Sequence, residues 1–130
     1  MRRLVAAWNA HDLDALAACY APNYVGQDVG APTPRHGPAD VRNAFARYVE
    51  AFPDLRFEIE RMVVEGPSAI IVWYASGTHR GLLMRIPPTG RKVAVWGTSV
   101  LTIADGLITR GHNIWDVAGV LRAIGLLPDL

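Results

Sequence analysis

Hydrophobic and polar positions change their spacing within the last quarter of the chain. Residues 107–115 alternate between two faces, which predicts a strand with even-numbered side chains on one side and odd-numbered side chains on the other. From Val117 the apolar residues recur at helical spacing as far as Gly125, which predicts a short C-terminal helix. Asp116 stands between the two elements. It could cap the helix by accepting hydrogen bonds from the first N–H groups, or it could serve as a general base at the mouth of a cavity.

The first part of the chain predicts helices on either side of a proline-rich segment. Residues 2–20 predict two short helices interrupted at residues 9–12, the second of them ended by Pro22. Residues 22–38 contain four prolines and three glycines, which predicts a long loop with a short strand around Tyr24 and Val25. Pro38 predicts the start of a further helix with a clearer apolar face than the first two. Its apolar face recurs at helical spacing until Pro53: Val41, Phe45, Tyr48 and Phe52.

From Leu55 the period becomes two, and strands follow one another. A change of parity near Met62 predicts a β-bulge. Residues 69–79 are apolar on both faces and should form a central strand, which residues 80–86 could continue. Residues 93–103 and 107–115 predict two more strands, joined by a tight turn at Asp105-Gly106. The predicted order is helices, then four antiparallel strands, then a short helix. This order predicts one α+β domain over residues 1–130. Its curved sheet would be covered on one face by the N-terminal helices and would enclose a pocket.

Composition narrows the classes of function. The 130 residues are 51% hydrophobic and 19% charged, which is typical of a globular domain. A net charge of +1 gives no reason to expect a nucleic-acid or membrane partner. The sequence contains no run of 18 apolar residues, so it predicts no transmembrane helix. The single cysteine, Cys19, excludes an internal disulfide and fits a reducing, cytoplasmic location, where it should be a small core residue.

Few ionisable residues could face the predicted pocket: Asp116, His112, His79 and His36. His112 and Asp116 are four residues apart, which is about 13 Å in a strand and too far for a shared metal. Two histidines and a carboxylate from separate strands stay as an alternative. The sequence has no glycine-rich phosphate loop and no nucleophile elbow. We therefore expect neither metal nor cofactor.

With metal, phosphate and nucleophile motifs absent from the sequence, the remaining prediction is acid–base chemistry without a cofactor. Asp116 is flanked by Ile114, Trp115 and Val117, so a dry environment could make it an effective base. His112 or His79 could donate to an oxygen that becomes an enolate, the pattern of ketosteroid isomerase. Equally, His79 could satisfy local backbone groups.

Aromatic residues could form the wall of a pocket for a flat ligand, although they are also ordinary core residues. The candidates are Trp8, Tyr24, Trp73 and Trp96. The sequence leaves open which parity of residues 93–103 faces inward. If the odd-numbered residues do, Ser99 lines the pocket and Trp96 does not.

Several short motifs recur together, in an order and spacing that resemble the SnoaL-like polyketide cyclase family of the NTF2-like superfamily. They run nearly from end to end of the chain. The motifs are residues 8–16 (WNAHDLDAL), 20–24 (YAPNY), 37–38 (GP), 52–54 (FPD), 77–81 (GTHRG), 87–90 (PPTG), 105–106 (DG), 115–116 (WD) and 119–122 (GVLR).

The resemblance implies a conical α+β barrel, often a homodimer or homotetramer, with a cavity for a polycyclic aromatic molecule. Family cyclases close a ring of an aromatic polyketide by intramolecular aldol condensation without metal or cofactor, and the resemblance puts their essential carboxylate at Asp116. Two positions depart from the pattern. Ser99 stands where many relatives have histidine, and His112 where many have tryptophan. These changes could preserve an acid role in a new geometry or mark a different substrate.

The sequence thus predicts a cofactor-independent enzyme for an aromatic polyketide, with Asp116 as general base and His112 or His79 as donor to the oxyanion. Trp8, Tyr24, Trp73, Trp96 and Ser99 are the expected substrate-binding residues. One alternative is a hydroxylase on the same scaffold, in which a carbanion reacts directly with oxygen. Another is a ligand-binding or dimerisation module with no catalytic activity.

Overall fold

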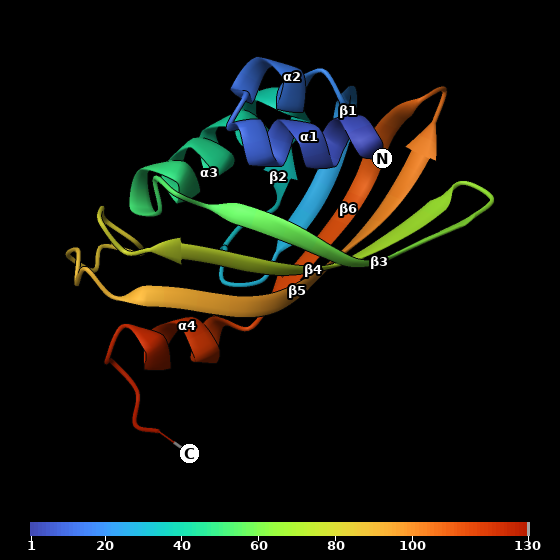
Figure 1. The fold of residues 1–130 in the computed structure, drawn as a ribbon. Helices are drawn as coiled ribbons and strands as arrows, with labels where there is room; N and C mark the ends of the chain where they lie inside the picture. The colour runs from blue at the N-terminus through green and yellow to red at the C-terminus, as the bar shows by residue number, and fades with distance from the viewer. Residues whose placement is uncertain (130) are drawn as a thin grey trace.

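Ten elements build one α+β unit, in which three helices lie over one side of a curved sheet (Figure 1). The computed structural model describes residues 1–129. In chain order the elements are α1 (Arg2–Ala10), α2 (Leu13–Ala17), β1 (Tyr20–Asp28), β2 (Arg35–His36), α3 (Gly37–Ala51), β3 (Arg56–Glu65), β4 (Ser68–Thr78), β5 (Lys92–Ala104), β6 (Leu107–Trp115) and α4 (Val117–Ala123).

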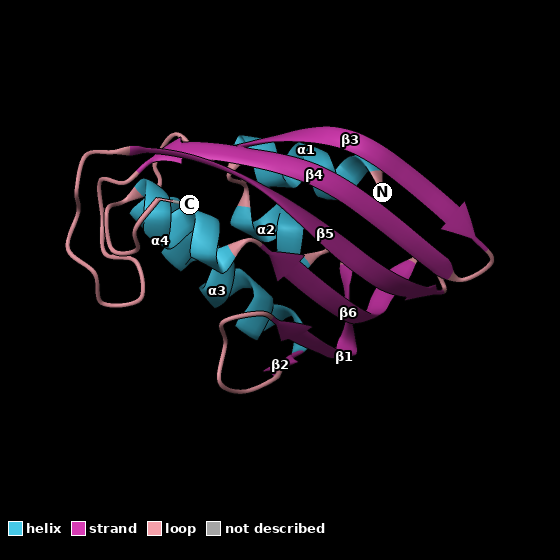
Figure 2. Ribbon diagram, turned by 90° about the horizontal axis from the view of Figure 1, so that it is seen from below, coloured by secondary structure: helices cyan, strands magenta, loops and turns pink. Residues whose placement is uncertain are grey.

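The sheet is mixed, with the strand order β2-β1-β6-β5-β4-β3. Only β1 and β6 run parallel; the other neighbours are antiparallel. Figure 2 shows the sheet from the side opposite α1–α3, with its strands strongly twisted. The predicted curved sheet with antiparallel strands is confirmed, the parallel β1–β6 pair makes it mixed, and it is not a closed barrel. Its two edges, β2 and β3, do not pair with each other, so helices rather than strands complete the enclosure.

Most predicted elements are present, including the short helix after Asp116 and the turn at Asp105-Gly106, where both residues have positive φ. The predicted bulge lies in β3, where the register with β4 shifts between Ile59 and Arg61. One of the missed features is β1, which is a full nine-residue strand. Pro22 belongs to this strand and does not end a helix. It lies where the pairing of β1 with β6 is interrupted, so its missing N–H costs no ladder hydrogen bond.

The predicted extension of the β4 strand through residues 80–86 is wrong. These residues form part of a long loop, in which Met84 and Arg85 both have positive φ. Leu83 and Ile86 close the tip of the loop by exchanging backbone hydrogen bonds, and the Leu83 side chain is buried. The loop therefore folds back onto the molecule instead of extending the sheet.

The core has two parts, which lie at the two ends of the concave side of the sheet. The larger part joins α1, α2 and α3 to the sheet and contains Leu4, Trp8, Tyr24 and Trp73. The smaller part closes the other end. It is formed by the end of α3, the loop after β4, the start of β5 and α4: Ala51, Phe52, Leu83, Val93, Val95, Val120 and Ile124.

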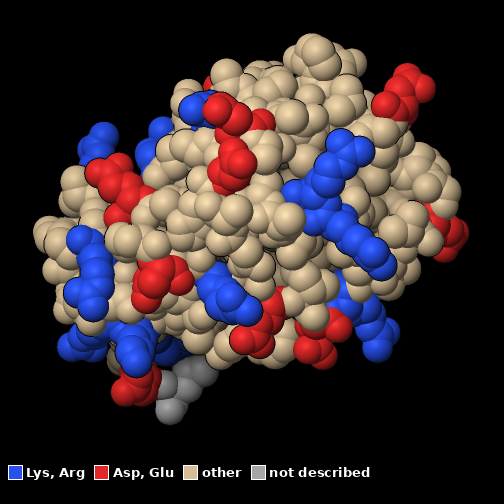
Figure 3. Space-filling model, turned by 45° about the horizontal axis from the view of Figure 1, so that its top comes forward, with Lys and Arg blue, Asp and Glu red and all other residues tan. Residues whose placement is uncertain are grey.

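The outer surface is charged but has no single sign. Figure 3 shows acidic and basic side chains interspersed on one face, in keeping with the net charge of +1. Within residues 1–129 no helix has the length and apolar character needed to cross a bilayer. Cys19 is half-buried, its thiol donates to the Ala15 carbonyl, and burial raises the pKa of that thiol.

Candidate functional site

A cavity of about 1050 Å³, counting the part that opens to solvent, lies between the concave face of the sheet and the helices. Its wall is mainly aromatic and aliphatic. The aromatic lining residues are Trp8, Tyr20, Tyr24, Phe45, Tyr48, Phe52, Phe57, Trp73 and Trp115. A flat apolar ligand would find a face to stack on along most of this wall.

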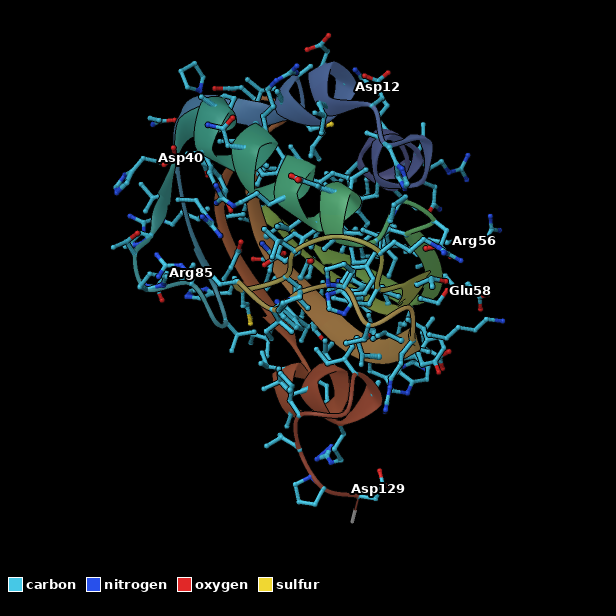
Figure 4. The ribbon with its side chains drawn as sticks, turned by 90° about the vertical axis from the view of Figure 1, so that its left-hand side faces the viewer. Asp12, Asp40, Arg56, Glu58, Arg85 and Asp129 are labelled. Carbon is cyan, nitrogen blue, oxygen red and sulfur yellow. The ribbon has the colours of Figure 1, made fainter. Side chains whose placement is uncertain are left out.

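Charged groups are nearly absent from this interior. In Figure 4 the labelled charged side chains, such as Arg56 and Arg85, lie at the periphery, away from the space between α3 and the sheet. Among the described residues that line the cavity, Asp28 is the only carboxylate and Arg35 the only cation. This pair therefore supplies the charged groups that the described cavity wall offers for acid–base chemistry.

Three segments meet close in sequence to the lining residues Asp28, Leu83 and Trp115, and their meeting point is called the rim here. A side-chain carbon built on Gly30, in the β1–β2 loop, would lie 3.2 Å from the Met84 side chain and 3.8 Å from that of Val117. The β1–β2 loop, the β4–β5 loop and the start of α4 therefore touch one another. Leu83 reaches past this rim to line the cavity itself.

A row of polar side chains crosses three strands on the floor of the cavity. In the sheet, Asp28 of β1 pairs with Asn113 of β6, and Asn113 pairs with Ser99 of β5. Asn113 Nδ2 donates to Asp28 Oδ1 at 2.8 Å, and Ser99 Oγ donates to Asn113 Oδ1 at 2.6 Å. Strand register thus brings together groups from the first and last thirds of the chain.

Trp73 of β4 continues this row. Its indole Nε1 donates to Ser99 Oγ at 3.1 Å. The indole can lie across β5 because the facing residue is Gly97, where an added side-chain carbon would be 2.1 Å from the Trp73 ring. Glycine at this position is therefore required by the close approach of the ring.

Arg35 holds the other oxygen of Asp28. Arg35 Nε lies 3.3 Å from Asp28 Oδ2, and the side chains are only 18% and 11% exposed respectively. Both charges are thus largely withdrawn from water and neutralise each other.

Three phenols beside this pair stay protonated at neutral pH. Burial, followed by the charge of Asp28, raises the pKa of Tyr24 to about 12. Burial also raises the pKa of Tyr48, with Asp28 as the next cause and Arg35 acting in the opposite direction. The pKa of Tyr20 is raised, again chiefly by burial. These phenols can therefore donate hydrogen bonds to a ligand oxygen but cannot act as bases at neutral pH.

Asp116 does not line the cavity. It is exposed and caps α4, where its Oδ1 accepts a hydrogen bond from the Gly119 N–H at 2.8 Å. The helix-cap alternative drawn from the sequence is therefore confirmed. The physical reason is local. Trp115 turns inward as the last residue of β6, and the next side chain turns back to the free N–H groups of the helix.

Neither predicted histidine lines the cavity. His112 is exposed on the outer face of the sheet, because its neighbours Gly111 and Asn113 take the inward positions. His79 is completely buried but outside the cavity lining. Its Nδ1 accepts from the Thr89 N–H at 3.3 Å and lies 3.0 Å from Thr89 Oγ1, and within residues 1–129 its Nε2 has no partner. The alternative that His79 serves local backbone groups fits this contact.

Four of the five residues predicted to bind substrate lie on the cavity wall. Trp8, Tyr24, Trp73 and Ser99 line the cavity, so the odd-numbered residues of β5 face inward. Trp96 does not. It is 51% exposed on the outer face, where its ring packs on Tyr74 with centroids 4.7 Å apart. Among the described residues no three His, Cys, Asp or Glu side chains gather as a metal site would require.

Sequence reasoning missed Asp28, Arg35 and Asn113. The first two lie beyond the short strand around Tyr24 and Val25 that the sequence predicts, in the part of residues 22–38 predicted to be loop. A signal did exist: Tyr24, Gly26 and Asp28 alternate as the inward side of a strand, and Asn113 shares its parity with Trp115.

Relatives of known structure share this fold. A protein with a ketosteroid isomerase-like fold from Catenulispora acidiphila matches with a TM-score of 0.83 at 19% identity, covering 97% of this chain and 92% of its own. AclR from Streptomyces galilaeus, a proposed hydroxylase, matches with a TM-score of 0.87 at 26% identity. The match covers 99% of this chain and 84% of AclR. The predicted NTF2-like fold is thereby confirmed.

Sequence similarity points to a family. The nogalonic acid methyl ester cyclase of Streptomyces nogalater is 32% identical over 130 residues, which cover 94% of this chain and 92% of the relative. The family model of the SnoaL-like polyketide cyclases matches residues 1–124. The chain belongs to the SnoaL-like polyketide cyclase family.

Proposed function

We propose that this chain closes a ring of an aromatic polyketide ester by intramolecular aldol addition, without a cofactor, and that Asp28 is the base. The observation that carries the proposal is that Asp28 is the one carboxylate among the described residues lining a mainly apolar, aromatic cavity. Family membership and the name of the cyclase relative support the same reaction class.

The reaction needs little from the protein beyond a weak base and hydrogen-bond donors. Asp28 takes the proton from the carbon between a ketone and an ester, which leaves an enolate. That carbon attacks a second carbonyl of the same molecule, one carbon–carbon bond forms, and the resulting alkoxide takes the proton back from Asp28. No atom is gained or lost, so the product has the mass of the substrate.

The neighbours of Asp28 suit this chemistry. A carboxylate is a weak base, and a carbon flanked by two carbonyls is acidic enough to need no stronger one. Arg35 has N–H groups beyond the one facing Asp28, and the phenols of Tyr24 and Tyr48 are protonated donors. In a mainly apolar cavity such donors stabilise a developing oxyanion.

A hydroxylase on the same scaffold is the second candidate, and its support is the likeness to AclR. There Asp28 would form the substrate carbanion, which would add molecular oxygen and take one proton to give a hydroperoxide that keeps both oxygen atoms. The same base and the same cavity serve both reactions, so the product and not the site separates them. A ligand-binding module without catalysis is the third candidate.

The decisive experiment is incubation of the purified protein, in air, with an anthraquinone that carries a β-keto ester side chain. A product of unchanged mass and shifted retention would support ring closure, and one heavier by two oxygen atoms, as a hydroperoxide is, would support reaction with oxygen instead. Asp28→Asn should lower the rate by roughly 10²- to 10⁴-fold, the usual contribution of a general base. Asp116→Asn is the control, because asparagine caps a helix as well as aspartate does. Loss of turnover in this control, with Asp28→Asn active, would contradict the assignment of the base.

A further inference from the structure

The hydrogen bonds on the cavity floor form a chain with a single direction. It begins at the Trp73 indole, passes through Ser99 and Asn113, and ends at Asp28. Ser99 is 1% exposed and Trp73 7%, so water offers little substitute for these contacts. The whole chain is built from β4, β5, β6 and β1, the four inner strands of the sheet.

The direction follows from what each group can do. An indole N–H can only donate, so Ser99 Oγ accepts from Trp73 and has one proton left to give. That proton goes to Asn113 Oδ1 at 2.6 Å, so the amide must turn its NH₂ group toward Asp28. An ionised carboxylate can only accept. Each donor in the chain therefore meets an acceptor.

The opposite orientation of the amide would break the chain at two points. Asn113 would then present its oxygen to the carboxylate of Asp28, which has no proton to share. Ser99 would face two donors, one from Trp73 and one from Asn113, and its own proton would have no acceptor. In a buried site each such mismatch is unfavourable. The Trp73 indole thus fixes the amide of Asn113 through Ser99, whose hydroxyl is bonded to both side chains.

We infer that Ser99 and Asn113 are positioning residues, which hold the carboxylate of Asp28 in one orientation for the reacting carbon. This inference rests on the proposed function for its catalytic meaning. Oδ1 is bound by Asn113 and Oδ2 by Arg35, so the carboxylate is fixed from both sides. A base held in this way has lost its rotational freedom before the substrate arrives.

The test uses resonances at the two ends of the chain, which require no substrate. In ¹H–¹⁵N spectra the Trp73 indole N–H and the Arg35 Nε–H report on Ser99 and Asp28 respectively. Ser99→Ala should shift both, the first directly and the second through Asn113 and Asp28. Ser99→Thr keeps the hydroxyl and should leave both nearer to wild type. Thr98→Ala, at the next position of β5 but on the other face, is the matched control and should shift neither.

Kinetics supply the second readout. Ser99→Ala should lower kcat by roughly 10- to 100-fold with little change in KM, as misplacement of a catalytic group does, and Ser99→Thr should restore most of the rate. An unmoved Arg35 resonance in Ser99→Ala would overturn the inference, and so would an unchanged kcat. If both resonances move but wild-type protein forms no product, the proposed reaction is wrong while the positioning of Asp28 by the chain stands.

Discussion

Asp28 and Asn113 lie 85 residues apart in the chain, yet Asn113 Nδ2 donates to Asp28 Oδ1 at 2.8 Å. The contact exists because β1 and β6 run parallel and place the two residues in register. It joins the strand that carries the cavity's carboxylate to the strand that carries its amide. The cavity floor therefore depends on the one parallel pairing of the sheet, the pairing that a prediction of hairpin-linked strands leaves out.

Asp116 should matter for stability and not for turnover. Asp116→Ala removes the hydrogen bond to the Gly119 N–H and should lower the free energy of unfolding by about 0.5–2 kcal/mol, the usual cost of a lost helix cap. Asp116→Asn keeps a capping oxygen and should stay close to wild type. Denaturant unfolding measures both. Since Asp116 lies outside the cavity, ring-closing activity of the folded variants should be unchanged; a loss of activity in folded Asp116→Asn would contradict this.

Filling the cavity should weaken ligand binding without unfolding the protein. Ala75 of β4 lines the cavity, so Ala75→Leu adds three carbons where an aromatic ligand would lie. Its affinity for an anthraquinone ligand should fall by roughly 10-fold or more, since steric overlap of this kind costs about 1–3 kcal/mol. Ala94→Leu is the matched control, because Ala94 is exposed on β5. Titration by fluorescence or calorimetry compares the two, and equal affinities would mean that the ligand binds elsewhere.

The two central tryptophans should respond differently to a ligand. Trp73 lines the cavity, whereas Trp96 is half exposed on the outer face. Quenching of tryptophan fluorescence by an anthraquinone ligand should therefore persist in Trp96→Phe and decrease in Trp73→Phe. A Trp96→Phe variant that lost most of the quenching would show that the outer face takes part in binding.

The helices, the hairpins and the fold could be predicted because they depend on local signals. Apolar spacing, prolines at helix starts and the turn at Asp105-Gly106 each act over a few residues. The alternation of residues in β5 also predicts that either Ser99 or Trp96, but not both, faces the cavity. The expected homodimer or homotetramer and the cytoplasmic location stay predictions.

The site could not be predicted to the same extent, because it depends on long-range pairing. Asp28 becomes a cavity residue only when β1 pairs with β6. A parallel pairing between distant segments has no local signal in the sequence from which it could be predicted. Asp116 was favoured because its sequence neighbours are apolar. Those neighbours pack inward, and the carboxylate itself turns to the N-terminus of α4. Apolar flanks in sequence therefore do not establish that a side chain is buried.

Asp54 should make stability depend on pH at the acidic end. Its carboxylate accepts hydrogen bonds at 2.7 Å from both the backbone N–H and the hydroxyl of Thr78, and these bonds lower the pKa of Asp54 below its usual value. A carboxyl whose pKa is lowered on folding stabilises the protein above its unfolded-state pKa of about 3.9, and this contribution disappears as the pH falls through the folded-state value. Asp54→Ala should thus lower the free energy of unfolding at pH 7, by about 1 kcal/mol because the side chain is exposed and screened. The difference from wild type should shrink below about pH 4. Denaturant unfolding at pH 7, 5 and 3 measures it, with Asp129→Ala near the C-terminus as the control; a difference that stays constant across this range would show that the charge of Asp54 contributes nothing.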